Sequence, residues 1–105
     1  MTRPFRTEPE ASDELNEAAL WYDSQRAGLG SEFLNAVDVA LAHIARWPQA
    51  GLRVPDLSAE LPVRRVPLRR FPYHVVYLEM PEQIRILAIA HDHRLPGYWR
   101  SRAVK

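Results

Sequence analysis

The chain has 105 residues, no cysteine, four glycines and nine prolines, with 26% charged and 47% hydrophobic positions. This length fits one domain over residues 1–105, and the lack of cysteine excludes a disulfide framework, a thiolate nucleophile and Cys-ligated zinc. No apolar run approaches the roughly 20 residues that a membrane span needs, and the N-terminus lacks the apolar region of a signal peptide. We therefore expect a single cytoplasmic domain that does not enter a membrane.

The formal net charge is only +1, but the two signs are divided between the halves of the chain. Residues 1–52 carry four cationic residues against eight acidic ones, whereas residues 53–105 carry ten against five. All the cations except Lys105 are arginines, whose planar guanidinium binds carboxylates and phosphates through paired hydrogen bonds. The C-terminal half therefore favours a phosphodiester backbone or an acidic peptide as partner. High genomic G+C content, which raises the number of Arg codons, is the alternative explanation.

Two amphipathic helices are predicted after a short strand at residues 5–7. Pro9 suits the first turn of the first helix, and acidic residues crowd that turn, where the helix dipole favours carboxylates. Its apolar face follows the helical spacing with Leu15, Ala18, Ala19 and Tyr22. Residues 28–30, Gly-Leu-Gly, break this helix, and a second one ends before Pro48. The apolar face of the second helix is formed by Phe33, Val37, Ala40, Leu41 and Ile44. The pattern predicts a helical hairpin.

Beyond residues 49–62, which have the composition of a loop, the hydrophobic period changes from 3.6 residues to 2. This period predicts three strands, at residues 63–68, 73–79 and 84–91. Because the connections are short, we expect the strands to be antiparallel, and Pro67 places the first of them at an edge or a bulge. The predicted fold class is therefore α+β, an antiparallel sheet with the helical hairpin on one face and a short C-terminal tail.

The last predicted strand has two different faces. One face, suited to pack under helices, would carry Ile84, Ile86, Ala88 and Ala90. The other, half apolar and half cationic, would carry Arg85, Leu87, Ile89 and His91. Since the pattern contains only two helices, we expect this second face to stay open for a partner segment. The alternative is that loop 49–62 or the C-terminal tail folds over it.

Cations, imidazoles and aromatic side chains recur along the predicted strands and the tail. The chain has neither a glycine-rich phosphate loop nor a serine in a glycine elbow, so we expect no cofactor and no nucleophilic triad. His91 and His93 share a face but lack a third ligand, so we expect no metal site. An Arg and a His or Tyr could instead cleave RNA without a metal, since the 2′-hydroxyl supplies the nucleophile. In the structural alternative Tyr98 and Trp99 anchor the tail, and the arginines pair with the acidic helices.

From about Glu10 to Arg102 the chain resembles the RelE/ParE superfamily, the toxins of bacterial type II toxin–antitoxin modules of the plasmid-stabilisation type. The order and spacing of short motifs carry the resemblance: Trp21-Tyr22, Gly28-Leu29-Gly30-Ser31-Glu32-Phe33, Val63-Arg64-Arg65, Arg70-Phe71-Pro72-Tyr73, Val76-Tyr77, and Ala90-His91 leading through Arg94 to Gly97-Tyr98-Trp99. The resemblance implies the order β-α-α-β-β-β and an antitoxin whose C-terminal segment wraps the toxin.

RelE-like members of this superfamily cut messenger RNA in the ribosome, whereas ParE-like members poison DNA gyrase. Matching the strands through Tyr73 keeps one basic position of the RelE pattern, at Arg65, and places Pro67, His74 and His93 at three others. We therefore predict a toxin that is neutralised by a cognate antitoxin and inhibits growth by binding DNA gyrase. The alternatives are a ribosome-dependent mRNA endoribonuclease and a decayed toxin that only binds its antitoxin.

Two sets of site residues follow from these readings. If the chain is a nuclease, Arg65 and Arg94 would hold phosphates, and the proton-transfer candidates are His74, His93 and Tyr98. The residues predicted to bind the antitoxin are Arg65, Arg70, Arg85, Leu87 and Ile89.

Overall fold

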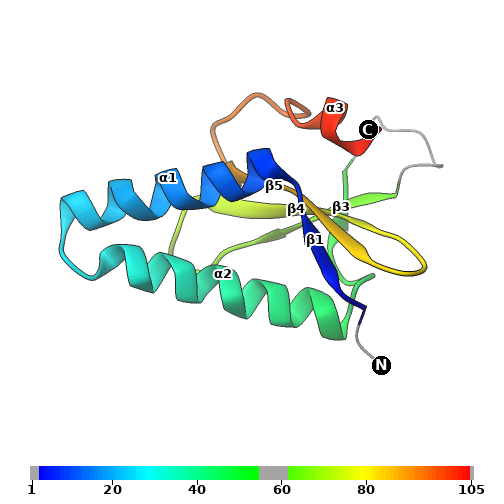
Figure 1. Ribbon diagram of the computed structural model, residues 1–105, viewed down its shortest axis with the longest axis horizontal. Helices are drawn as coiled ribbons and strands as arrows, with labels where there is room; N and C mark the ends of the chain where they lie inside the picture. The colour runs from blue at the N-terminus through cyan, green and yellow to red at the C-terminus, as the bar shows by residue number, and fades with distance from the viewer. Residues whose placement is uncertain (1–2, 55–61, 105) are drawn as a thin grey trace.

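The computed structural model describes residues 3–54 and 62–104, and these residues form a five-stranded sheet with two long helices packed on one face (Figure 1). The elements are β1 (Phe5–Thr7), α1 (Pro9–Gln25), α2 (Leu29–Arg46), β2 (Leu52–Arg53), β3 (Val63–Pro67), β4 (Tyr73–Glu79), β5 (Ile84–His91) and α3 (Arg100–Ala103). The predicted α+β class is confirmed. β2 and α3 were not predicted, because elements of two and four residues are too short to show a period. Residues 55–61 of the predicted loop lie outside the described residues.

The helical hairpin is confirmed, and two glycines allow its tight turn. Gly28 adopts a left-handed backbone with φ 90° at the start of α2. Gly30 lies where α2 approaches α1 so closely that a Cβ would collide with the backbone oxygen of Ala19. The backbone N–H of Gly30 also donates to Asp23 Oδ1 at 2.7 Å. The glycines therefore set both the turn and the spacing of the two helices.

The strand order is β1-β5-β4-β3-β2, and the sheet is mixed rather than wholly antiparallel. β3, β4 and β5 pair antiparallel as predicted, and β2 also pairs antiparallel with β3, but β1 runs parallel to β5, with Phe5 opposite Ile84. The two helices and three further strands separate β1 from β5 in the chain. A connection of that length permits the parallel pairing that a tight turn would forbid.

A β-bulge in β5 overturns part of the predicted division of faces. Val76 of β4 pairs with Ala88, whereas the next residue, Tyr77, pairs with Ile86, so Leu87 is an inserted residue. Ile84 and Ile86 face the helices as predicted. Beyond the bulge the alternation is inverted: Ala88 and Ala90 pack on the second face, and Ile89 packs under the helices. The faces predicted for these three residues are wrong, because one inserted residue exchanges every later side chain between the faces.

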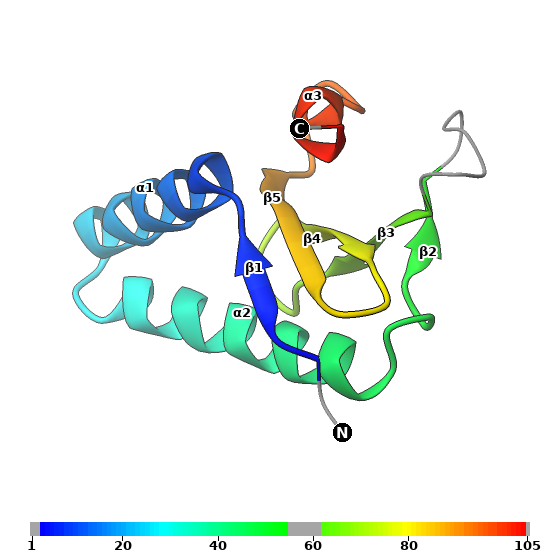
Figure 2. The same ribbon diagram turned by 45° about the vertical axis from the view of Figure 1, so that its right-hand side comes forward.

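The second face of the sheet is covered by the C-terminal segment, which we define as residues 95–104. Trp99 is only 3% exposed and packs, with Ala103, against the buried residues Val76, Leu87 and Ala90. Figure 2 shows α3 on the opposite side of the sheet from α1 and α2. The expectation of an open face is therefore wrong, and the alternative, that the C-terminal tail folds over it, is confirmed. Burial of a Trp and several aliphatic side chains supplies the driving force.

Glu14 of α1 fastens this segment to the rest of the domain. Its carboxylate accepts hydrogen bonds from the Tyr98 hydroxyl at 2.7 Å, from the Arg102 guanidinium at 2.9 and 3.1 Å, and from the backbone N–H of Ile89 at 3.1 Å. Arg102 also donates to the carbonyl of Leu87 at 3.0 Å. One acidic side chain thus joins α1, β5 and the C-terminal segment.

Candidate functional site

A pocket opens between the second face of the sheet and the C-terminal segment. Arg65 of β3, His74 of β4 and Arg94 of the turn after β5 line it, together with Tyr98 and Trp99. Arg65 is paired with Val76 in the neighbouring strand, two positions from His74, so the pleat directs Arg65 and His74 to the same face. Four of the five predicted catalytic residues therefore surround one pocket.

The imidazole of His74 is held by an aspartate. Its Nδ1 lies 2.9 Å from Oδ1 of Asp92, whose backbone N–H donates to the carbonyl of Pro72 at 2.8 Å. A carboxylate at Nδ1 favours the tautomer that carries its proton there, so the other ring nitrogen, Nε2, can take up a proton. The sequence pattern did not predict this pair, because its two residues are 18 positions apart in the chain. The register that sets Tyr73 opposite His91 brings Asp92 to His74.

The other two proton-transfer candidates have different surroundings. Tyr98 donates its hydroxyl proton to Glu14, and burial, followed by that hydrogen bond, raises the pKa of Tyr98 far above its ordinary value. At neutral pH this hydroxyl therefore keeps its proton, which it donates to Glu14. His93 does not line the pocket: it lies in the turn after β5, exposed, and its backbone N–H donates to Nδ1 of His91 at 3.0 Å. Arg94 stacks its guanidinium 4.0 Å from the centre of the Tyr98 ring, which holds it at the pocket.

The residues predicted to bind the antitoxin do not form a single surface. Arg65 lies at the pocket on the second face, whereas Arg70 lies beside α2, where its guanidinium donates to Glu32 at 3.0 Å. Leu87 and Ile89 are buried on opposite faces of the sheet. The expectation that these two side chains are exposed is wrong, because the bulge and the C-terminal segment bury them within the chain itself.

Arg85 is also buried rather than exposed. Its guanidinium lies 3.2 Å from the Glu8 carboxylate, and it donates to the carbonyls of Arg102 at 2.6 Å and Ala103 at 3.2 Å. A buried guanidinium needs such partners for its several donors. Arg85 therefore fixes the end of the C-terminal segment over the sheet, and a partner chain would reach it only after that segment moved.

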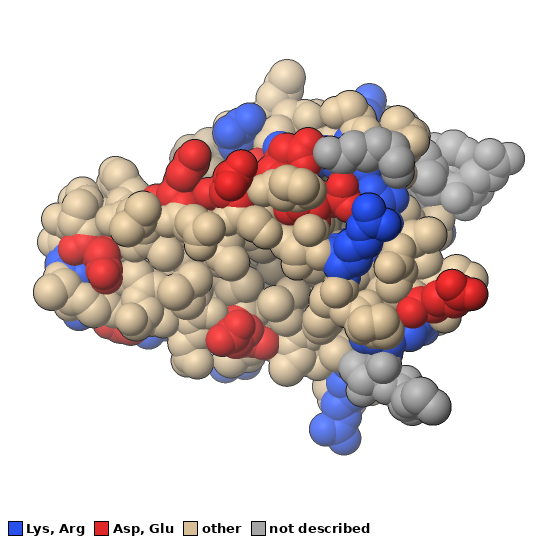
Figure 3. All heavy atoms as spheres, viewed as in Figure 1, with Lys and Arg blue, Asp and Glu red and all other residues tan. Residues whose placement is uncertain are grey.

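The division of charge along the sequence is also a division in space. Figure 3 shows acidic side chains gathered over the N-terminal half of α1. Arg65, Arg70 and Arg94 come from the sheet and its connections instead. Glu32 of α2 is one point where the two sets meet, besides the pairs of Glu8 with Arg85 and of Glu14 with Arg102. Hydrogen bonds from Arg70 and from Arg26 lower the pKa of the Glu32 carboxyl. Part of the predicted pairing between arginines and acidic helices is thus present.

Comparison with known proteins finds a similarity of fold. No family model and no curated protein sequence matches the chain. Among solved structures, the chain is similar to one described as "Chromosomal ParDE TA system from P. aeruginosa", with 18% sequence identity and a TM-score of 0.61 over 86% of this chain and 96% of the other. In residues 3–54 and 62–104 no helix is long and apolar enough to cross a membrane, and no three His, Asp or Glu side chains are grouped to hold a metal ion.

Proposed function

We propose that this chain is the toxin of a type II toxin–antitoxin module, that a cognate antitoxin neutralises it in the cytoplasm, and that it inhibits growth by binding DNA gyrase. The observation that carries the proposal is the fold, which aligns over 86% of the chain with a structure from a ParDE system. The ordered sequence motifs of the RelE/ParE superfamily support the same proposal.

The surroundings of the site residues support a toxin that binds rather than one that cleaves. A binding inhibitor needs a stable surface, whereas a nuclease needs several unoccupied acid, base and cationic groups at one point. Here the Tyr98 hydroxyl is bound to Glu14, and His93 lies outside the pocket. At one of the basic positions of the RelE pattern this chain has Pro67, which carries no charge. These features favour a toxin that acts by binding over one that cleaves RNA.

A second candidate, an mRNA endoribonuclease, is favoured by the pair of His74 and Asp92 in a pocket with two arginines. In this reading Arg65 and Arg94 would hold the phosphate, and Nε2 of His74 would take the proton of the ribose 2′-hydroxyl. The 2′-oxygen would then attack phosphorus, the bond from phosphorus to the 5′-oxygen would break, and the leaving 5′-oxygen would take a proton from water. The products would be a 2′,3′-cyclic phosphate and a 5′-hydroxyl end.

The two candidates are separated by inducing the chain alone in bacterial cells and measuring both transcript integrity and plasmid topology. We expect growth arrest with gyrase–DNA breaks and intact transcripts. His74→Ala should then leave the arrest unchanged, as should His93→Ala, the matched histidine outside the pocket. Cleaved transcripts with normal DNA, abolished by His74→Ala and not by His93→Ala, would replace the gyrase function with the nuclease. Growth without arrest would refute an active toxin of either kind.

A further inference from the structure

A groove runs between α2 and the chain segment that leaves β3, and we name it the α2–β3 groove. Its apolar lining comes from Ala36, Val39 and Ala40 of α2 and from Val66, Leu68 and Phe71 on the sheet side. Val39 is 57% exposed, although it is a large aliphatic side chain. Val39 therefore continues the apolar lining out to the surface, and an exposed apolar patch rimmed by polar residues marks an interaction site.

The sheet leaves this groove uncovered at one edge. β2 pairs only with Arg64 and Arg65 of β3, so within the described residues the outer edge of β3 has no neighbouring strand from Val66 onward. The next residue is Pro67, which has no backbone N–H to donate to another strand. The groove is therefore suited to side-chain packing rather than to extension of the sheet.

The groove has a cationic rim. Arg69 is exposed and forms no ion pair in the part of the chain that the structure describes, and Arg70 is exposed beside it. Glu32, the carboxylate at this rim, is shared by Arg70 at 3.0 Å and Arg26 at 2.9 Å. Arg70 also has a φ of 72°, a backbone conformation that residues other than glycine adopt rarely and that is concentrated at functional sites. The rim thus carries more positive charge than its own carboxylate neutralises.

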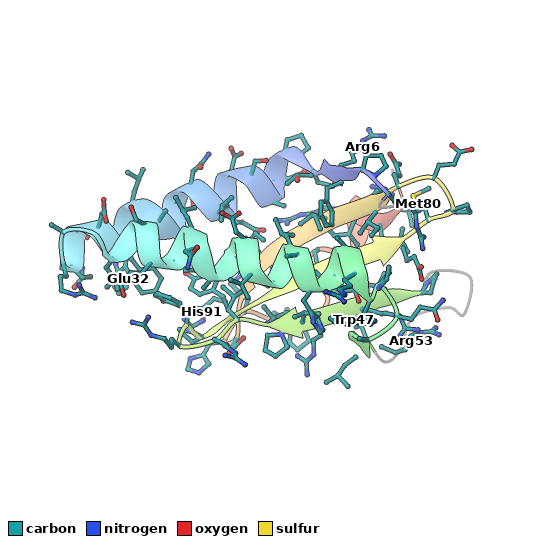
Figure 4. The ribbon with its side chains drawn as sticks, turned by 90° about the horizontal axis from the view of Figure 1, so that it is seen from below. Arg6, Glu32, Trp47, Arg53, Met80 and His91 are labelled. Carbon is teal, nitrogen blue, oxygen red and sulfur yellow. The ribbon has the colours of Figure 1, made fainter. Side chains whose placement is uncertain are left out.

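The opposite end of α2 continues the same surface. Val39 and His43 lie about one turn apart on α2, so they share one side of the helix. Trp47 comes just after the helix, and the centre of its ring lies 5.4 Å from that of His43. Trp47 is 52% exposed, and the guanidinium of Arg46 stacks 4.8 Å from the centre of its ring. Figure 4 shows Glu32 near one end of α2 and Trp47 at the other. Exposed Trp and Arg side chains are enriched among the residues that dominate binding energy at interfaces.

We propose that the α2–β3 groove is the docking site of an acidic amphipathic segment of the antitoxin. Its apolar side chains would pack on Val39 and the groove lining, and its carboxylates would pair with Arg69 and Arg70. Charge complementarity selects an acidic segment over a basic one, and the apolar lining selects a peptide over a phosphodiester backbone. The inference rests on the proposed function for the identity of the partner. It moves the predicted partner from the second face of the sheet to the helix side.

The direct test uses chemical-shift mapping of the ¹⁵N-labelled full chain with two designed helical peptides of equal length. Both carry the same Leu and Ala positions on one face, and their other face carries only Glu in one peptide and only Lys in the other. The Glu peptide should shift the amides around Val39 and residues 66–71, and it should bind about tenfold more tightly than the Lys peptide at low salt. Its advantage should shrink as salt is added.

Matched variants place the binding in the groove. Val39→Glu should weaken binding of the Glu peptide by about tenfold or more, whereas Leu20→Glu, at a site on α1 that is 72% exposed, should have no effect. Both substitutions replace an exposed aliphatic residue of a helix, so both variants should keep the wild-type spectrum. The double variant Arg69→Glu, Arg70→Glu should prefer the Lys peptide. The inference would be overturned if the two peptides bound equally well, or if the chemical-shift changes fell outside the groove or were absent at millimolar peptide. It would also be overturned if the chain associated with itself through the groove.

A cellular test separates this inference from the proposed function. Val39→Glu should still arrest growth but escape neutralisation by a co-expressed cognate antitoxin, whereas Leu20→Glu should be neutralised normally. If Val39→Glu is neutralised as well as the wild type, the groove is not the docking site, although the chain is a toxin. If the wild type itself causes no arrest, the proposed function fails, and the peptide titration alone decides whether the groove binds acidic segments.

Discussion

Removing the carboxylate of Glu14 is expected to release the C-terminal segment from the sheet. Glu14 and Arg102 are 17% and 12% exposed, so they form a largely buried ion pair, and Tyr98 and the backbone of Ile89 donate to the same carboxylate. Breaking a buried pair by deleting one partner costs about 3–5 kcal/mol. Because this pair keeps some contact with water, we expect about 3 kcal/mol for Glu14→Ala, which lowers Tm by roughly 12 °C or more in a domain of this size.

Trp99 provides the assay for this prediction. It is 3% exposed, whereas Trp21 and Trp47 are 57% and 52% exposed, so a red shift of fluorescence on release of the segment reports Trp99. Thermal unfolding would be compared with that of Glu17→Ala, an exposed glutamate one turn further along α1, which should change stability by less than about 0.5 kcal/mol. A double-mutant cycle with Arg102→Ala should show coupling of about 1–3 kcal/mol. Additive effects, or a Tm like that of Glu17→Ala, would refute the reasoning.

Three further predictions concern the packing of the fold. Gly30→Ala should destabilise the protein by about 1–2 kcal/mol in urea unfolding, because the added Cβ would meet the Ala19 carbonyl. Helix propensity alone predicts instead a gain in stability of about 1 kcal/mol, and that result would contradict the close contact. Burial raises the pKa of Tyr98 and of three other tyrosines. Their contribution to the free energy of unfolding should therefore be complete below about pH 10 and be lost as the pH rises above it. A free energy of unfolding that stays constant from about pH 8 to 12 would contradict this prediction. Tyr77→Phe should lower the free energy of unfolding by about 1–3 kcal/mol in the same assay. The buried hydroxyl donates to the Pro48 carbonyl at 2.6 Å and accepts from a backbone N–H, and both hydrogen bonds would be lost. Wild-type stability would show that water replaces both bonds.

The candidate site was predictable in part. Arg65 and His74 lie on one sheet face. This shared face can be predicted from the alternation of side chains along β3 and β4 and from the antiparallel pairing of the two strands. The partner of His74 required the register of β5 against β4, because Asp92 lies just beyond the last paired residue. The engagement of Tyr98 by Glu14, 84 positions earlier, has no local signal at all.

The number of predicted helices did not determine whether the second sheet face is covered. The chain has two long helices, and this count predicts one covered face. A four-residue helix and Trp99 nevertheless cover the other, since a single Trp with a few aliphatic neighbours buries enough apolar area to hold a short segment in place. The polar contacts of Arg85 and Arg102 then close the ends of that segment.

The amino-acid sequence by itself determined the two helices, their glycine turn and the three long strands, because each depends on periodicity and on residues such as Pro9 and Gly28 that act on their own backbone. Only the tertiary structure decided the parallel pairing of β1, the inversion of faces beyond Leu87 and the closure of the second face by Trp99. Those features depend on contacts between residues far apart in the chain, and such contacts form only where the whole fold brings their partners within reach.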